Sequence, residues 1–588
     1  MIIVGGGISG LYCVKELLDK PHLLAKRAIK SIIILEKCGK WGGRVDTEFI
    51  KIADADEREV VFKCEQGAMR FIYRNDLKDN PKATESFLSQ LIQDLGMEND
   101  VQPFYMEPQL RKIQPQSHSM TTPNCNNRYF NGQHFTATEW CAAQNHTMLK
   151  NLFNLEREEE MKSAGKIIID INQKLLHHNK SKLEFHFPDT AEVILAQQDT
   201  KLLQEYEDSD YWAVFRNEFT WAVGTQDIPL NKFSLQSLLS VMGYSHECFM
   251  MMVQTLRFPP EADVGTALRN LMTFNVNKDN FYQFEKGCSS LVENLMEHLK
   301  KTSIKAGVRL EFKKNCTVMM VSGHEEGFSV TVETQLDEKS KTMDLSTKNV
   351  IMALPPKAIE SILDRSRSEF CSINAEKITK ICRSVKGVQC TKITFYYDGN
   401  WWNQVENTMM YGANVTSLPC CQVYPFYGEI AKVGCNGGPA ALTIFCNVRD
   451  APFWSSLQKL GCKFQSPLQG QNERLFPASE PVVTEAIRQF CKVFNMKSVP
   501  RPILTSYRTW GGNGEDDALG EEQYGYAVHF WGVGVDNYQI MKEVVQPMEG
   551  KNLFLCNEAW SPSQGWMEGS LQGARKAVEK LLRLDSNQ

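Results

Sequence analysis

The chain has 588 residues, of which 42% are hydrophobic and 23% are charged. This composition is typical of a globular protein and excludes a collagen-like or wholly disordered chain, and the length predicts about two to four structural units. The 65 Lys and Arg residues against 70 Asp and Glu residues give a net charge of −5. Because the sequence shows no basic stripe, nucleic acid is not expected as a partner.

The sequence predicts neither a transmembrane segment nor a metal site. The best candidate for a spanning helix, residues 233–245, falls short of the roughly 18 apolar residues that a bilayer requires. The 18 cysteines include no C-x-x-C pair, so no zinc site is expected. Met1 is followed directly by an apolar run and three glycines, which leaves no room for a secretory leader. We therefore expect a cytoplasmic location, or secretion if the chain has been trimmed.

The N-terminal segment has the order of a dinucleotide-binding unit. Two short apolar runs, typical of strands buried on both faces, flank a glycine-rich turn and a helical pattern. Gly5 makes the tight turn, Gly7 lets a pyrophosphate approach the backbone, and Gly10 lets the helix pack closely on the strand. The second run ends at Glu36, whose carboxylate can accept hydrogen bonds from a ribose. The spacing from Gly10 to Glu36 is longer than usual, and residues 21–30 predict an extended helix end or a loop.

A second glycine element follows this acid. Gly42 and Gly43 precede Arg44, which would place a fixed cation beside a diphosphate. A glycine turn with a solvated arginine is the alternative interpretation. The position shortly after Glu36 favours the role in cofactor binding.

With the opening turn, this G-G-R element resembles the flavin-dependent amine oxidase superfamily. Residues 67–71, Gly-Ala-Met-Arg-Phe, are similar to the G-x-M-R motif of its L-amino-acid oxidases. The resemblance implies that Arg70 clamps the substrate carboxylate, which a planar guanidinium binds through two parallel hydrogen bonds. Monoamine and polyamine oxidases have no arginine there. A surface salt bridge is the alternative role for Arg70, but Met69 and Phe71 on either side favour burial.

Later motifs extend the resemblance over most of the chain. Lys392 matches the lysine that holds a water near the flavin and is the expected catalytic residue, although a lone lysine is usually solvated. Gly565 and Trp566 match the pair that contacts the substrate amine. The alternative role for Trp566 is that of a core aromatic residue, and the alternative for Glu558 is an ordinary acid at the start of a helix. The resemblance implies that FAD is contacted by Gly5, Gly7, Ile8, Ser9, Gly10, Glu36, Lys37, Gly42, Gly43, Arg44, Gly67, Ala68, Met69, Arg70, Val318, Asn557, Glu558, Gly565, Trp566 and Met567.

Two features depart from the family pattern. Where many L-amino-acid oxidases have a tyrosine that shares the carboxylate, this chain has Phe445. We expect Phe445 to line the substrate site, with Tyr424 or another hydroxyl replacing that tyrosine, unless the substrate is recognised differently. The monoamine oxidases bind flavin through a cysteine, and residues 501–554 contain none. FAD is therefore expected to bind without a covalent bond.

The resemblance and the pattern of apolar residues predict an α/β fold, with a Rossmann-type FAD-binding domain, a mixed-sheet substrate domain and a helical insertion. The FAD-binding domain is expected in three parts, 1–60, 279–385 and 546–588. The substrate domain is expected at 61–135 and 386–545, and the helical insertion at 136–278.

The implied activity is oxidation of an L-amino acid to a 2-oxo acid, ammonia and hydrogen peroxide, with dioxygen as the second substrate. An amine or polyamine oxidase would share the FAD motifs without needing Arg70. An amino-acid 2-monooxygenase would share Arg70 and release an amide. A flavin-stabilised binding protein would have little reason to keep Lys392. The sequence leaves open which amino acid is used and whether the protein is a homodimer.

Overall fold

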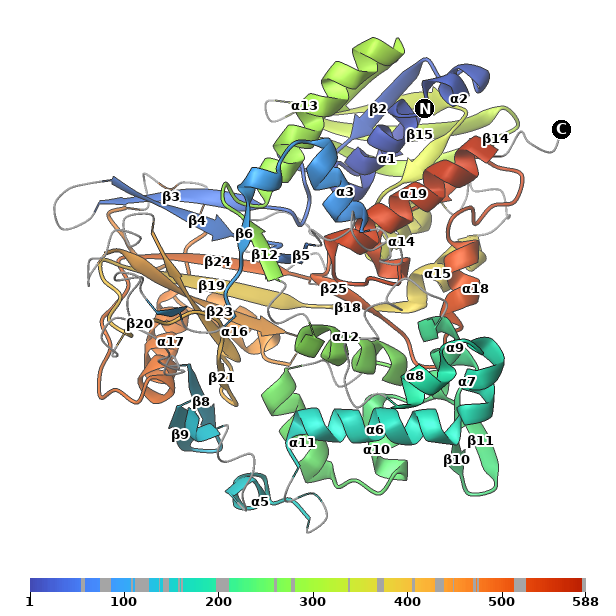
Figure 1. The fold of residues 1–588 in the computed structure, drawn as a ribbon. Helices are drawn as coiled ribbons and strands as arrows, with labels where there is room; N and C mark the ends of the chain where they lie inside the picture. Colours follow the sequence, from blue (N-terminus) through green and yellow to red (C-terminus); the bar gives the residue numbers. More distant parts are fainter. Residues whose placement is uncertain are drawn as a thin grey trace.

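The fold is taken from a computed structural model, which shows a parallel sheet, a larger mixed sheet and a helical unit meeting around a common centre (Figure 1). It describes residues 1–53, 59–73, 86–106, 109–110, 126–136, 138–140, 148–156, 159, 162–196, 211–257, 262–276, 281–336, 339–366, 375–403, 408–428, 438–447, 449–468, 472, 475–511 and 525–583.

Five parallel strands form the first sheet. Their order is β13 (Arg309–Lys313), β2 (Ser31–Leu35), β1 (Ile2–Val4), β17 (Val350–Met352) and β26 (Leu553–Leu555). Successive side chains of a strand point to opposite faces, so Ile3 packs in one core, and Ile2 and Val4 pack in another. The Ile3 core includes residues of the longer helices α1 (Ile8–Leu18), α13 (Ser289–Ala306) and α19 (Met567–Arg583). Burial on both faces explains why the three strands β1, β17 and β26 are apolar throughout.

The opposite face of this sheet is covered by a second layer. The layer consists of an antiparallel sheet of β14 (Cys316–His324), β15 (Gly327–Leu336) and β16 (Lys339–Thr347), together with helices α14 (Pro356–Ser366) and α15 (Ala375–Arg383). Ile2 and Val4 of the parallel sheet share their core with Val330 of β15 and Ile359 of α14.

Seven strands form the mixed sheet. Their order is β24 (Leu504–Trp510), β19 (Cys390–Tyr397), β23 (Ala440–Asn447), β22 (Gln422–Tyr427), β21 (Asn414–Thr416), β8 (Asn127–Phe130) and β9 (Gln133–Thr136). All neighbours are antiparallel except β21 and β8. Helices α16 (Ala451–Gln458) and α17 (Glu480–Val493) pack on one face and bury Trp454 and Phe490.

The helical unit occupies the lower part of Figure 1. It contains α5 (Met148–Phe153), α6 (Ala164–His178), α7 (Lys180–His186), α8 (Ala191–Ala196), α9 (Tyr211–Asn217), α10 (Leu235–Val241), α11 (His246–Leu256) and α12 (Val264–Val276), with a hairpin of β10 (Thr220–Val223) and β11 (Gln226–Pro229). Ser163, Ser234 and Ser245 cap the first turns of α6, α10 and α11, because each side chain accepts a hydrogen bond from a backbone N–H.

Shorter elements connect these units. They are the pairs β3 (Thr47–Ala53) and β4 (Glu59–Glu65), β18 (Val385–Val388) and β25 (Val528–Trp531), and β7 (Gln109–Leu110) and β20 (Thr408–Met409). A three-stranded sheet joins β5 (Phe71–Ile72), β12 (Phe281–Phe284) and β6 (Val101–Pro103), and the remaining helices are α2 (Pro21–Lys26), α3 (Phe87–Asp94) and α18 (Asn537–Glu543).

The predicted fold class is confirmed: the chain combines a parallel α/β unit, a mixed sheet and a helical region. The three segments expected to form the FAD-binding domain each contribute strands to the parallel sheet. Residues 21–30, predicted as an extended helix end or a loop, contain the separate short helix α2. Within the described ranges, no helix is both long enough and apolar enough to span a bilayer.

Candidate active site

A cavity of about 460 Å³ lies where the parallel sheet, the mixed sheet and the helical unit meet. It brings together most of the residues that the sequence singled out, although they are spread over the whole chain. Those that line it are Gly5, Gly7, Ile8, Ser9, Glu36, Lys37, Gly42, Gly43, Arg44, Gly67, Ala68, Met69, Arg70, Lys392, Phe445, Asn557, Glu558, Gly565, Trp566 and Met567.

At one end of this cavity is the turn between β1 and α1. Gly5 has a φ of +104°, which favours glycine. A Cβ on Gly10 would lie 2.0 Å from the carbonyl oxygen of Gly5, so only glycine lets the helix sit this close to the strand. Gly7 is the N-cap of α1 and makes no side-chain cap. A Cβ on Gly7 would meet the carbonyl oxygen of Gly42 at 3.9 Å, which is an ordinary contact. Gly7 also lines the cavity, so a phosphate could approach the N–H groups of the first helical turn from there.

Glu36 lies just beyond the end of β2, next to this turn. Its Oε2 accepts a hydrogen bond from the N–H of Gly6 at 2.7 Å, and its Oε1 accepts one from the N–H of Cys38 at 2.8 Å. Burial raises the pKa of Glu36 above its usual range, and the two backbone hydrogen bonds oppose that shift. The carboxylate is thus held in one orientation and retains lone pairs for a hydroxyl donor.

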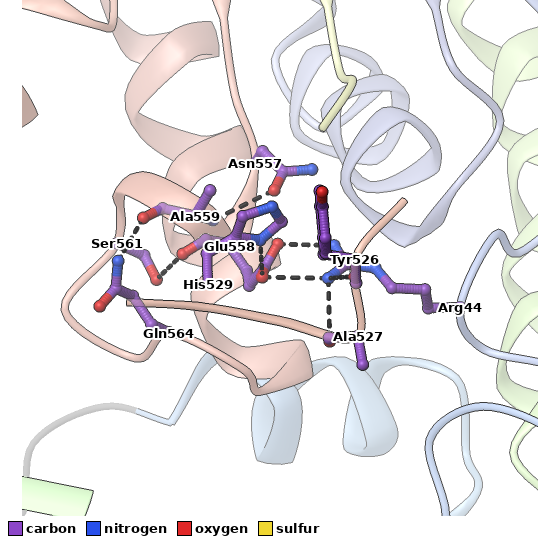
Figure 2. A network of polar contacts seen from close by, with 9 residues as sticks. All are labelled: Arg44, Tyr526, Ala527, His529, Asn557, Glu558, Ala559, Ser561 and Gln564. Carbon is purple, nitrogen blue, oxygen red and sulfur yellow. Dashed lines mark hydrogen bonds and ion pairs between the residues drawn. The ribbon is translucent and has the colours of Figure 1, made fainter. Parts of the chain in front are cut away.

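Arg44 and Glu558 form an ion pair at the wall of the cavity, in which the carboxylate is buried and the guanidinium is partly exposed (Figure 2). Arg44 donates to the two carboxylate oxygens at 3.0 and 2.5 Å, and to the carbonyls of Tyr526 and Ala527. Nδ1 of His529 lies 2.7 Å from Oε1 of the same carboxylate. Burial alone would raise the pKa of Glu558, but Arg44 and His529 outweigh it and hold the pKa well below its usual range.

Arg70 follows the short loop after β4 and is surrounded by aromatic rings. Nη1 donates to the hydroxyl of Tyr424 at 3.2 Å and lies 3.9 Å from the sulfur of Met106. The guanidinium carbon lies 5.6 Å from the ring centre of Phe104, 5.2 Å from that of Phe281 and 5.7 Å from that of Tyr424. Such rings hold a guanidinium in place and exclude water around it.

Lys392 lies in β19 and is buried. Its Nζ donates to the carbonyl oxygens of Glu65, at 2.9 Å, and of Gly67, and lies 5.9 Å from the ring centre of Phe445. Burial lowers the pKa of Lys392, the charge of Glu65 opposes that shift, and the charge of Arg70 adds to it. A buried amine with a lowered pKa is a common feature of catalytic sites.

Trp566 and Gly565 form another part of the cavity wall. The ring of Trp566 stacks on that of Phe281, with centres 5.9 Å apart and planes within 9°. Gly565 has a φ of +82°, and a Cβ there would lie 2.7 Å from Val528. Phe445, on β23, lines the same cavity.

Two predicted residues do not line the cavity. Gly10 lies beneath Gly5, as its expected role in helix packing requires. Val318 pairs with Val332 between β14 and β15, so its contact with an adenine ring remains a prediction. A second cavity, of about 490 Å³, is also lined by Trp566 and contains none of the residues of the β1–α1 turn.

The sequence reasoning missed Arg508, Trp510 and His529. Arg508 and Trp510 line the first cavity from β24, and His529 contacts Glu558 from β25. Charged side chains are seldom buried, and β24 is buried throughout. An arginine in such a strand was the signal that could have pointed to Arg508.

Residues 8–429 match the family model described as flavin containing amine oxidoreductase. Solved structures similar to the chain include cyclohexylamine oxidase from Brevibacterium oxydans IH-35A (TM-score 0.55, 14% identity) and a triple mutant of putrescine oxidase with redesigned cofactor binding (TM-score 0.56, 14% identity). In both cases the match covers 99% of this chain and 98% of the other. At this identity the likeness shows the fold alone. The comparison with curated proteins finds no match.

The chain therefore belongs to the flavin-containing amine oxidoreductases, and its cofactor is FAD. The residues present fit that cofactor. The N-terminus of α1, which has no side-chain cap, lines the cavity at Gly7, where a diphosphate would lie, and Glu36 is oriented to receive a ribose.

Proposed function

We propose that the protein oxidises the Cα–N bond of an L-amino acid and that Arg70 binds the substrate carboxylate. The observation that supports this most strongly is the setting of Arg70: a guanidinium that lines the cavity of the flavin site, among aromatic rings and beside a hydroxyl. A simple amine offers nothing for that guanidinium to bind. A carboxylate would accept two parallel hydrogen bonds from it.

The remaining wall residues would fix the other end of the substrate. With the carboxylate at Arg70, the α-amino group would lie near the backbone of Gly565 and the ring of Trp566, which stacks on Phe281 beside Arg70. This two-point attachment orients the Cα–H bond, and orientation of this kind accounts for a large part of enzymatic rate enhancement. Lys392, which is buried and lines the same cavity, would hold a water.

Bound FAD supplies the two-electron acceptor, and dioxygen would reoxidise it. For each amino acid consumed, one dioxygen and one water would yield one 2-oxo acid, one ammonium ion and one hydrogen peroxide. The role of the chain is to bind and orient the substrate and to exclude bulk water.

An amine or polyamine oxidase is the alternative, because the same cofactor site serves both reactions. We would test the proposal by measuring peroxide release from the holoenzyme with the twenty amino acids, with their decarboxylated amines and with polyamines. The proposal predicts peroxide from at least one amino acid and little from its amine. Turnover of amines alone would contradict it.

A further inference from the structure

Arg508 is a buried cation that lines the cavity from β24. Its exposed fraction is 7%, and its Nε has no hydrogen-bond partner among the residues that the structure describes. The guanidinium carbon lies 4.6 Å from the ring centre of Trp510, which also lines the cavity. Across the described ranges, no carboxylate forms an ion pair with Arg508.

Two other arginines of the cavity wall have acidic partners. Arg44 is paired with Glu558, and Nη1 of Arg257 lies 3.9 Å from the carboxylate of Asp450. A charge that is buried without a partner costs several kcal/mol. Arg508 is therefore suited to receive an anionic group that enters with a ligand.

The position of Arg508 indicates which ligand that is. Lys392 of β19 is the direct register partner of Phe445 on one side and of Arg508 on the other. Residues directly opposite each other in antiparallel strands point to the same face, so these three side chains share the floor of the cavity. The charge of Arg70 also acts on Lys392. Arg70 and Arg508 thus both lie close to Lys392, the predicted catalytic residue.

The diphosphate of the cofactor is not the expected partner of Arg508. The turn that would hold a diphosphate follows β1 of the parallel sheet, whereas Arg508 belongs to the mixed sheet beside Lys392. An anion at Arg508 would instead be part of the substrate.

We propose that the substrate is an acidic amino acid, of the aspartate or glutamate type, with its α-carboxylate at Arg70 and its side-chain carboxylate at Arg508. This inference rests on the proposed function and narrows it to one substrate class. The planar fork of an arginine matches a carboxylate in a way that a lysine cannot.

The kinetic test compares each acid with its neutral isostere. We would measure kcat/KM for L-glutamate and L-glutamine, and for L-aspartate and L-asparagine, in the wild type, Arg508→Gln and Arg508→Lys. Wild type should prefer the acid by about tenfold or more, and Arg508→Gln should reduce that ratio by about tenfold or more. Arg508→Lys should restore part of it. Arg488→Gln, at an exposed arginine paired with Glu485, is the control for loss of one positive charge.

A binding test gives a readout that does not depend on turnover. Glutarate has two carboxylates and no amine. Butyrate has one carboxylate and is one carbon shorter than glutarate. Titrating the flavin absorbance of the wild-type holoenzyme should show tighter binding of glutarate than of butyrate by about tenfold or more. That comparison needs no variant, so it remains decisive if Arg508→Gln fails to fold.

Three results would each overturn a different claim. Equal turnover of the acids and their amides, or a ratio unchanged by Arg508→Gln, would overturn the substrate class while leaving the proposed function standing. Equal affinity for glutarate and butyrate would overturn the assignment of Arg508 as an anion-binding residue. Turnover of amines and of no amino acid would overturn the proposed function itself.

Discussion

The hydroxyl of Tyr424 lies 3.2 Å from Nη1 of Arg70, across 354 residues of sequence. The resemblance to L-amino-acid oxidases predicted a tyrosine at the position of Phe445. In this chain, Tyr424 of the neighbouring strand β22 places a phenol beside the arginine. The phenol accepts a hydrogen bond from the guanidinium and so helps to orient the group that we propose as the binding site of the substrate carboxylate.

Replacing Tyr424 with Phe tests this contact. The substitution removes the hydroxyl and keeps the ring that lies near Arg70, so the change should be confined to one hydrogen bond. We expect kcat/KM for the amino acid to fall about two- to tenfold, since such a bond contributes about 0.5–1.5 kcal/mol. Steady-state peroxide assays would measure it. Unchanged kinetics would show that Tyr424 does not orient Arg70.

Lys392→Met tests the predicted catalytic residue. Methionine has a similar length and no charge, so substrate affinity should hold while flavin reduction or reoxidation slows by about a hundredfold, the lower end of what a positioned proton-transfer group contributes. Stopped-flow absorbance measures both rates. If both match the wild type, the assignment of Lys392 is wrong.

Gly10→Ala and Gly165→Ala form a matched pair, because both glycines lie in helices. A Cβ at Gly10 would lie 2.0 Å from a backbone oxygen, whereas a Cβ at Gly165 would meet nothing within 4 Å. Gly10→Ala should lower stability by at least about 1–3 kcal/mol and weaken FAD retention. Gly165→Ala should be neutral or more stable by up to about 1 kcal/mol. Thermal unfolding and the ratio of flavin to protein absorbance measure both effects, and similar behaviour of the two variants would contradict this packing argument.

Glu558→Gln tests the ion pair of Arg44 with the buried Glu558 through its pH dependence. The pKa of Glu558 lies below the ordinary value of 4.5, so the carboxylate stabilises the fold above that pH and loses this effect as the pH falls toward the folded pKa. The variant should be less stable than wild type by about 3–5 kcal/mol at neutral pH. That difference should shrink below about pH 4.5. Denaturant unfolding across this range measures it, and a difference that widens in acid would be incompatible with a lowered pKa.

Local patterns of the sequence were sufficient to predict the cofactor end of the site. The turn at Gly5, the close packing at Gly10 and the acid at Glu36 lie within one strand–helix–strand unit, where spacing alone determines the geometry. The structure places Gly5 and Glu36 on one cavity wall and Gly10 directly beneath Gly5.

The substrate end depends on contacts between distant strands, which spacing cannot reveal. The Arg70–Tyr424 contact joins a loop after β4 to β22, and the position of Arg508 beside Lys392 depends on the register of β24 on β19. The sequence left Tyr424 as one of several options and gave no role to Arg508. A strand register is set by the packing of the whole sheet, so a single sequence does not determine it.

The most direct test of the central claim is the effect of Arg70→Ala on an amino acid and on its decarboxylated amine. The variant removes charge-assisted hydrogen bonds of roughly 1.5–3 kcal/mol each and leaves the incoming carboxylate unpaired. We predict that kcat/KM for the amino acid falls about 10³-fold, that Arg70→Lys recovers part of it, and that the amine is poor with both enzymes. A wild-type enzyme that prefers the amine, with amino-acid turnover unaffected by Arg70→Ala, would contradict the account.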